Sequence, residues 1–144
     1  MTYCVAMRLD RGLVFASDTR TNAGVDNIAQ YRKIHYWCQQ GDRVIVLLAA
    51  GNLSLTQSVV SLEPAPESPN LLTVQSMYRA ARLVGEAIRN VRALDGPSLD
   101  ANKMGFAGSF ILGGQIKSEA PRLFQIYPEG NFIEATDDTP YFQI

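Results

Sequence analysis

The chain predicts an α+β fold in which two antiparallel sheets pack together and helices flank them, a four-layer αββα sandwich. Strand-like alternation of apolar and polar residues occupies the first third, helical periodicity the middle, and strand patterns the last third. Because a sheet and an amphipathic helix each have an apolar face to bury, this order favours stacked sheets covered by helices. The 144 residues contain no internal repeat or linker, so we expect a single domain, 1–144.

The first third predicts an antiparallel meander of four strands. Residues 2–9 alternate in polarity, and a short turn returns the chain as a second strand over residues 13–18. A loop leads to a third expected strand, residues 28–37. The fourth, residues 43–50, contains the run VIVLL, which is too apolar for a half-exposed strand. We expect it to be central and buried on both faces.

Two helices are expected next. Asn52 is a suitable N-cap for a helix that continues to about residue 62, because its side chain accepts from N–H groups of the first turn. Three prolines then predict a loop. Residues 73–91 place apolar side chains at helical spacing, and the Asp-Gly-Pro sequence that ends at Pro97 is expected to stop this second helix.

The last third predicts three strands, at residues 108–116, 122–127 and 132–135. The sequence Pro-Glu-Gly-Asn at residues 128–131 is expected to form a tight turn between the last two.

Composition excludes several classes of partner. The 13 Lys and Arg residues and 14 Asp and Glu residues are interspersed and give a net charge of −1, which disfavours nucleic acid and anionic membranes. No apolar run approaches the ~18 residues of a membrane helix, and the N-terminus lacks a secretory signal. Two cysteines, Cys4 and Cys38, are too few for a disulfide framework. We therefore expect a cytoplasmic protein with free thiols.

Thr2 is the first candidate for chemistry. Removal of Met1 leaves a threonine whose hydroxyl and α-amine belong to one residue, so a nucleophile and a proton acceptor lie within a few bonds of each other. Retention of Met1 leaves Thr2 without a free amine.

Asp18, Lys33 and Gly51 complete the candidate site. The proton acceptor for Thr2 is either its own α-amine or Lys33, whose pKa of ~10.4 would have to fall for it to act as a base. A nearby Asp18 favours the charged ammonium, so we assign Asp18 to positioning Lys33 and leave the base open. The N–H of Gly51, where a strand gives way to a helix, is the expected oxyanion donor.

Each of these residues alone also has an ordinary structural explanation. A threonine after the start methionine, an aspartate in a turn, a lysine on an edge strand and a glycine in a turn are all common. Their combination favours a catalytic site. His35 has no cysteine or carboxylate at ligand spacing, so we expect no metal and no cofactor.

Thr2 behind the start methionine, Ser-Asp-Thr-Arg at residues 17–20, Lys33 and Ala-Ala-Gly at residues 49–51 together resemble a proteasome β subunit. The longer runs TYCVAMRLDRGLVFASDTRTNAG and AAGNLSLTQ are similar to Anbu, the bacterial proteasome-related family. The likeness continues through FILGGQI and FQIYPEGNFIEATDDT.

This resemblance implies the N-terminal-nucleophile type of the four-layer sandwich and a threonine peptidase that forms an acyl-enzyme on Thr2. It implies rings or open spirals of identical subunits in the cytoplasm, and a peptide or small amide as substrate. By analogy, Thr21 and Asn22 pair with a peptide along an open strand edge. Family members continue beyond the residue equivalent to Ile144, so the resemblance implies a domain shortened at its C-terminal end, without the family's later serine and aspartate near the nucleophile.

Two alternatives use the same sequence features. One is a catalytically silent scaffold or peptide-binding assembly that keeps the fold without turnover. The other is an amidohydrolase that acts on non-peptide amides with the same residues. The presence of Thr2, Asp18 and Lys33 together favours the enzyme.

Overall fold

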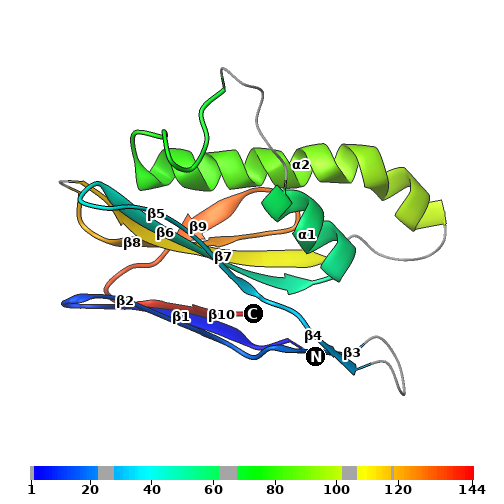
Figure 1. The fold of residues 1–144 in the computed structure, drawn as a ribbon, viewed down its shortest axis with the longest axis horizontal. Helices are drawn as coiled ribbons and strands as arrows, with labels where there is room; N and C mark the ends of the chain where they lie inside the picture. The colour runs from blue at the N-terminus through cyan, green and yellow to red at the C-terminus, as the bar shows by residue number, and fades with distance from the viewer. Residues whose placement is uncertain (1, 23–27, 62–67, 102–106, 118) are drawn as a thin grey trace.

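A computed structural model describes residues 2–22, 28–61, 68–101, 107–117 and 119–144. Two helices cover one face of a five-stranded sheet, and a three-stranded sheet lies against its other face (Figure 1). The helices are α1 (Leu53–Ser61) and α2 (Met77–Ala101). The mixed α/β content that the sequence predicts is confirmed.

The five-stranded sheet has the order β5-β6-β7-β8-β9, and each neighbouring pair is antiparallel. Its strands are β5 (Ile34–Gln39), β6 (Arg43–Gly51), β7 (Gly108–Ile116), β8 (Arg122–Ile126) and β9 (Phe132–Glu134). The long antiparallel ladder between β6 and β7 runs from Arg43 opposite Ile116 to Gly51 opposite Gly108.

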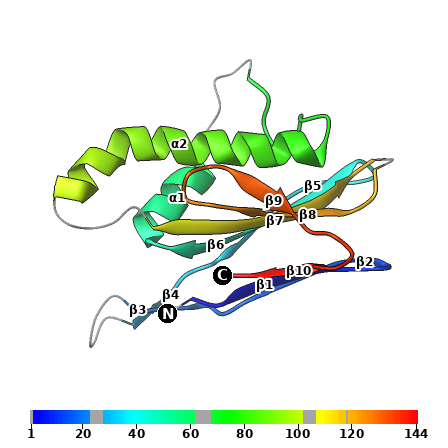
Figure 2. The same ribbon diagram turned by 180° about the vertical axis from the view of Figure 1, so that it is seen from behind.

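The second sheet has the order β10-β1-β2 and is also antiparallel. Its strands are β1 (Cys4–Leu9), β2 (Gly12–Ser17) and β10 (Tyr141–Gln143). A two-stranded ribbon of β3 (Arg20–Asn22) and β4 (Ile28–Gln30) extends from the end of β2. In Figure 2 this ribbon lies beside the N-terminus, at one end of the layered sheets.

Side chains fill two interior layers, one between the helices and the five-stranded sheet and one between the two sheets. Leu47 belongs to the first layer and Leu48 to the second, so β6 is central and packed on both faces, as its apolar run predicts. The exception is Val44, which is half exposed at the end of the strand beside the β5–β6 turn.

Local signals account for most element boundaries. The backbone N–H of Ser54 donates to Asn52 Oδ1 at 3.0 Å, which confirms Asn52 as the cap of α1. The three strands expected in the last third are present, and their bounds agree within one residue.

The single strand expected over residues 28–37 is wrong. The chain forms β4, leaves the ladder over residues 31–33, and re-enters a different sheet as β5. Residues 28–30 pair with β3, and residues 34–39 pair with β6. The two halves of the expected strand therefore belong to different sheets. Lys33 therefore lies in the link between two sheets and not within a strand.

The expected end of the second helix is also wrong. The structure carries α2 from Met77 through Pro97 to Ala101, although proline removes one backbone hydrogen bond and crowds the preceding turn. The last part of α2 bends away from the rest of the helix (Figure 1), which is how a helix accommodates an internal proline. The short strands β3 and β10 were not predicted, because three residues are too few for a periodic pattern.

Both described helices lie on the same side of the five-stranded sheet (Figures 1 and 2). The outward face of the β10-β1-β2 sheet carries large apolar side chains that are about 40–55% exposed, namely Tyr3, Met7, Leu9, Val14 and Tyr141. None of the helices among the described residues has the length and apolar character needed to cross a membrane.

Candidate active site

The candidate residues meet at one end of the two sheets. Thr2 precedes β1, Asp18 follows β2, Lys33 lies in the link before β5, and Gly51 ends β6. The alternation of the meander brings these four chain positions to the same end, because β1 and β2 are antiparallel neighbours and β6 lies above them in the other sheet.

Asp18 and Lys33 form an ion pair in which the lysine is buried and the aspartate is partly exposed. Lys33 Nζ donates to Asp18 Oδ1 at 2.8 Å and to Oδ2 at 2.9 Å. A third bond goes to the carbonyl oxygen of Arg20 at 2.6 Å. The Lys33 side chain is 5% exposed, whereas that of Asp18 is 34% exposed. The hydrogen-bond donors of the Lys33 side chain thus all have acceptors.

The same carboxylate holds the start of the first strand. Asp18 Oδ1 accepts the backbone N–H of Tyr3 at 2.8 Å, and the N–H of Asp18 donates to the carbonyl of Tyr3 at 3.0 Å. Asp18 Oδ2 accepts the N–H of Arg20 at 3.2 Å. The residue directly after Thr2 is therefore fixed by two hydrogen bonds to the acid of the ion pair.

The pKa of the Asp18 carboxyl is the net result of opposing effects. Desolvation is the largest single effect and raises the pKa. The hydrogen bonds from Lys33, Tyr3 and Arg20, together with the charge of Lys33, outweigh it and hold the pKa below its ordinary value. Asp18 is accordingly a carboxylate at neutral pH.

Gly51 lies where β6 ends and α1 is about to begin, and it has a φ of 118°, a conformation that side chains rarely adopt. A Cβ at this position would overlap the carbonyl oxygen of Ala107. The N–H of Ala49 donates to Lys33 O at 3.0 Å, and the N–H of Gly51, two residues further, points to the same side. That direction leads past the start of β5, towards the Lys33 link.

Thr21 and Asn22 belong to β3, immediately after the ion pair. Opposite them in the ribbon are Ala29 and Ile28 of β4. One edge of β3 is thus already paired, and in the described sheets its other edge has no neighbouring strand.

Cys4 is a neighbour of the ion pair that sequence analysis assigned only to packing. Its side chain is fully buried, and Sγ lies 3.8 Å from the carbonyl oxygen of Ala49. Burial raises the pKa of the Cys4 thiol to about 11, with a smaller lowering by Lys33 and a smaller raising by Asp18. The alternating pattern of the first strand could have predicted this contact, because it places Cys4 and Thr2 on the same face.

His35 does not join the site chemistry. Burial is the main cause that lowers the pKa of the His35 imidazole, and the positive charge of Arg32 lowers it further. The ring is therefore neutral at pH 7. Within the described ranges, no three His, Cys, Asp or Glu side chains gather so that they could hold a metal ion.

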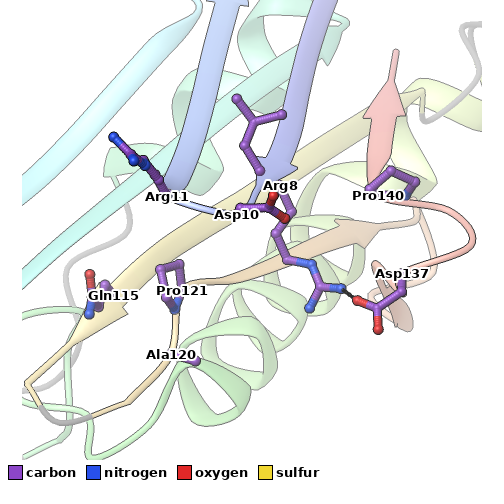
Figure 3. Close-up of a pocket in the computed structure, with 10 residues that line it drawn as sticks. Arg8, Asp10, Arg11, Gln115, Ala120, Pro121, Asp137 and Pro140 are labelled. Carbon is purple, nitrogen blue, oxygen red and sulfur yellow. Dashed lines mark hydrogen bonds and ion pairs between the residues drawn. The ribbon is translucent and has the colours of Figure 1, made fainter.

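A large cavity of about 990 Å³ lies at the other end of the sheets, beside the β1–β2 turn. Figure 3 shows Arg8 and Asp137 pointing towards one another across part of it, and they form an ion pair. The cavity is lined by the end of β1 and by the β7–β8 connection. It is therefore separated from Thr2 by the length of the first strand.

Comparisons with known proteins give a consistent result. No family model and no curated protein matches the chain. Among solved structures, an Anbu (Gly-1) mutant from Hyphomicrobium sp. strain MC1 is 64% identical with a TM-score of 0.90, covering 100% of this chain and 60% of that chain. Anbu (ancestral beta-subunit) from Yersinia bercovieri is 56% identical over 99% of this chain and 60% of its own, with a TM-score of 0.88.

A third structure describes the helical assembly of the Anbu complex from Pseudomonas aeruginosa. Its chain is 48% identical, with a TM-score of 0.91, over 99% of this chain and 60% of that one. The present chain thus spans about 60% of the length of the structures it matches. Over nearly its whole length, the chain is similar in sequence and in structure to proteasome-related, β-subunit-like proteins. The similar structures are Anbu proteins from several bacteria.

Proposed function

We propose that this protein is an N-terminal threonine hydrolase of the proteasome type, which cleaves peptide bonds through an acyl-enzyme on Thr2. The observation that carries the proposal is the Asp18 carboxylate, which accepts both the Lys33 ammonium and the N–H of Tyr3, the residue next to Thr2. A buried ammonium paired with an acid that also holds the backbone beside Thr2 is the arrangement expected for an activated nucleophile.

The geometry favours the α-amine of Thr2 as the base. Lys33 has an acceptor for each of its three protons, so it has no free lone pair to receive another. An α-amine has an ordinary pKa of ~7.7–8.0, and a nearby ammonium lowers it, which keeps part of the amine unprotonated at pH 7. Lys33 therefore acts as a fixed positive charge, and Asp18 positions it.

The reaction then proceeds in two steps, acylation of Thr2 and hydrolysis of the resulting ester. Thr2 Oγ attacks the substrate carbonyl while its proton passes to the α-amine, and the N–H of Gly51 donates to the oxyanion. The carbon–nitrogen bond breaks as the α-amine returns the proton to the departing amine, which leaves an ester on Thr2. Water attacks this ester, its proton passes through the same amine to Thr2 Oγ, and the acid product leaves.

Substrate binding follows from the ribbon beside the site. We assign Thr21 and Asn22 to peptide binding, because the free edge of β3 offers backbone groups that an extended peptide can pair with. No cofactor is called for. The substrate class is a peptide or a small amide.

The proposal includes self-assembly and the four-layer fold. The Pseudomonas neighbour is described as a helical assembly, which supports assembly of identical copies into rings or open spirals. The proposal places this assembly in the cytoplasm, without nucleic acid or membrane as partner. The exposed apolar face of the β10-β1-β2 sheet supports a further layer of helices outside it. That layer would complete the αββα sandwich of the N-terminal-nucleophile type.

The decisive experiment is covalent labelling with a β-lactone, after intact-mass measurement has shown whether Met1 is removed. We expect one adduct on Thr2, no adduct in Thr2→Ala, and an unchanged adduct in Thr19→Ala, which removes a neighbouring exposed threonine. Retained Met1 contradicts the mechanism.

The alternatives give different outcomes in the same assay. An assembly with a free Thr2 amine that takes no adduct is a silent scaffold or peptide-binding protein. An enzyme that is labelled and hydrolyses simple amides but no peptide is an amidohydrolase of the second kind.

A further inference from the structure

A cavity of about 200 Å³ lies in the layer between the helices and the five-stranded sheet (Figure 1). Trp37 of β5 and Leu47 of β6 form its wall on the sheet side. Both helices contribute side chains, Val59 from α1 and Val84 from α2 among them, and the segment 70–72 forms the remaining wall. The cavity is therefore bounded by four secondary-structure elements and one connecting segment.

The lining is neutral and almost entirely apolar. Among the described residues that line the cavity, none is charged, and the side chains that carry a polar group belong to Trp37 and Asn70. Asn70 Oδ1 already accepts the N–H of Leu72 at 2.8 Å. An ion that entered would lose its hydration without gaining a charged partner. The cavity therefore selects a neutral ligand.

The segment 70–72 is held in place by the protein itself. The N–H groups of Thr73 and Val74 both donate to the carbonyl oxygen of Asn70 at 2.9 Å. Arg43 Nη1, at the start of β6, donates to the carbonyl oxygen of Val74 at 2.6 Å. The Arg43 side chain is only 10% exposed, so this link is shielded from water. The cavity is thus largely formed before a ligand arrives, which is typical of small-molecule sites.

The volume limits the size of the ligand. Drug-sized ligands occupy pockets of about 300–1,000 Å³, whereas an apolar cavity of about 150 Å³ binds benzene. At about 200 Å³, the cavity admits one aromatic ring with a small substituent, but not a nucleotide or a long acyl chain. Apolar side chains around an empty space forgo the van der Waals contacts that such a ring supplies.

We propose that this cavity is a binding site for a small neutral aromatic molecule of about one ring. The ligand contacts Trp37 and both helices. An aromatic ring suits this wall because it packs favourably, offset or edge-on, against an indole. The inference goes beyond the proposed hydrolysis, since none of the residues assigned to that reaction lines the cavity.

Fluorobenzene is a suitable probe, and para-fluorobenzoate is a charged counterpart of similar shape. Fluorine NMR titration of the full-length protein gives a dissociation constant for each. We expect saturable binding of fluorobenzene. We expect para-fluorobenzoate to bind at least about ten-fold more weakly, because its carboxylate would be buried without a partner. No saturable binding of fluorobenzene, or equal binding of the two probes, overturns the proposal.

Ala87→Leu and Ala93→Leu show where the probe binds. Both substitutions place the same side chain on α2, but Ala87 lines the cavity, whereas Ala93 is exposed and does not. We expect Ala87→Leu to fill the cavity and weaken fluorobenzene binding about ten-fold or more, and Ala93→Leu to leave it unchanged. Saturating fluorobenzene should raise the thermal unfolding midpoint of wild type and of Ala93→Leu, but not of Ala87→Leu. Undiminished binding by Ala87→Leu places the probe elsewhere and overturns the site.

Leu83→Ala tests the same cavity in the opposite direction and does not require that Ala87→Leu folds. Loss of the Leu83 side chain enlarges the cavity, so we expect this variant to bind fluoronaphthalene, which the wild type excludes. Equal binding of fluoronaphthalene by both proteins contradicts the assigned walls. Fluorobenzene affinity that rises as the protein is diluted would show that a second copy fills the cavity, which overturns the small-molecule ligand. The β-lactone adduct on Thr2 reports on the hydrolase independently of all these results.

Discussion

Asp18 has the most contacts of the candidate residues, since its two oxygens accept from one side chain and two backbone groups. Its lowered pKa makes part of the stability depend on pH. The folded carboxyl gives up its proton more readily than the unfolded one, so the stabilisation is fully present above the unfolded pKa of ~3.9. It is lost as the pH falls through the lower folded pKa.

We therefore expect Asp18→Asn to reduce stability at pH 7 by about 3 kcal/mol, because it leaves the buried Lys33 ammonium without its carboxylate. The difference from wild type should shrink as the pH falls below ~3.9. Urea unfolding between pH 2.5 and pH 7 measures it. Asp10→Asn, at an exposed turn, is the control and should change stability by less than about 0.5 kcal/mol. A constant difference at all pH values would refute the linkage.

The two cysteines should differ in reactivity. Cys38 is exposed, whereas Cys4 is fully buried and the pKa of its thiol is about 11. The nucleophile in alkylation is the thiolate, so Cys4 is protected by both access and charge. We expect iodoacetamide at pH 8 to modify Cys38 in the folded protein and Cys4 only after denaturation, as peptide mass spectrometry can show. Equal alkylation rates for both thiols would mean that iodoacetamide reaches the interior between the two sheets, which contradicts the burial of Cys4.

The sequence was sufficient to propose the side chains of the site but not their backbone partners. Thr2, Asp18 and Lys33 stand out because each of these side chains has a chemical role in amide hydrolysis. The groups that hold Lys33 and Asp18 in place include the Arg20 carbonyl and the Tyr3 N–H. Backbone groups are present at every position, so no residue type marks them, and only the folded path of the chain shows which ones take part.

At the scale of elements, α2 meets the β8–β9 turn through two glycines. A Cβ on Gly85 would overlap the carbonyl oxygen of Gly130, and a Cβ on Gly130 would overlap that of Gly85. Arg89 adds a hydrogen bond to Gly130 O at 3.1 Å. The helix and the turn thus approach to backbone contact, which only glycine at both positions permits.

Gly130 and Gly41 provide a matched test of this contact. Both have a φ of 76°, but a Cβ at Gly41 meets no atom within 4 Å. Asparagine tolerates this backbone conformation, so Gly41→Asn should cost less than about 1 kcal/mol. Gly130→Asn should cost about 2 kcal/mol more, because the helix has to move away from the turn. Thermal unfolding of the two variants measures the difference, and equal losses would mean that only the backbone conformation matters.

Elements in which one strand kept one partner were predicted well, and the failures occurred where the chain changed partners. Residues 28–37 have a continuous strand-like pattern, yet β4 and β5 belong to different sheets. Alternation reports only which side chains share a face, not which strand lies alongside. The prediction that Pro97 ends the second helix failed for a different reason. A bend in α2 removed the steric conflict that would have ended the helix.

At the scale of the whole molecule, the order of strands and helices correctly predicted mixed α/β layers, while the fourth layer remains a prediction. The apolar outer face of the β10-β1-β2 sheet is the physical reason to expect it. Exposed apolar patches larger than a few hundred Å² are uncommon on soluble proteins and mark surfaces that something covers. In the expected four-layer fold the cover is helical and belongs to the same chain.

Met7 reports on this cover, with Met77 as an internal reference. Met7 lies on the outer face and is 39% exposed, whereas Met77, the first residue of α2, is fully buried. Oxidation by peroxide requires access to the thioether sulfur, so we expect the full-length protein to oxidise Met7 as slowly as Met77. Peptide mass spectrometry over a peroxide time course gives both rates in one sample. A Met7 rate equal to that of the denatured protein would contradict a fourth layer. Protection that disappears on dilution would assign the cover to a second copy, because a layer within one chain does not depend on concentration.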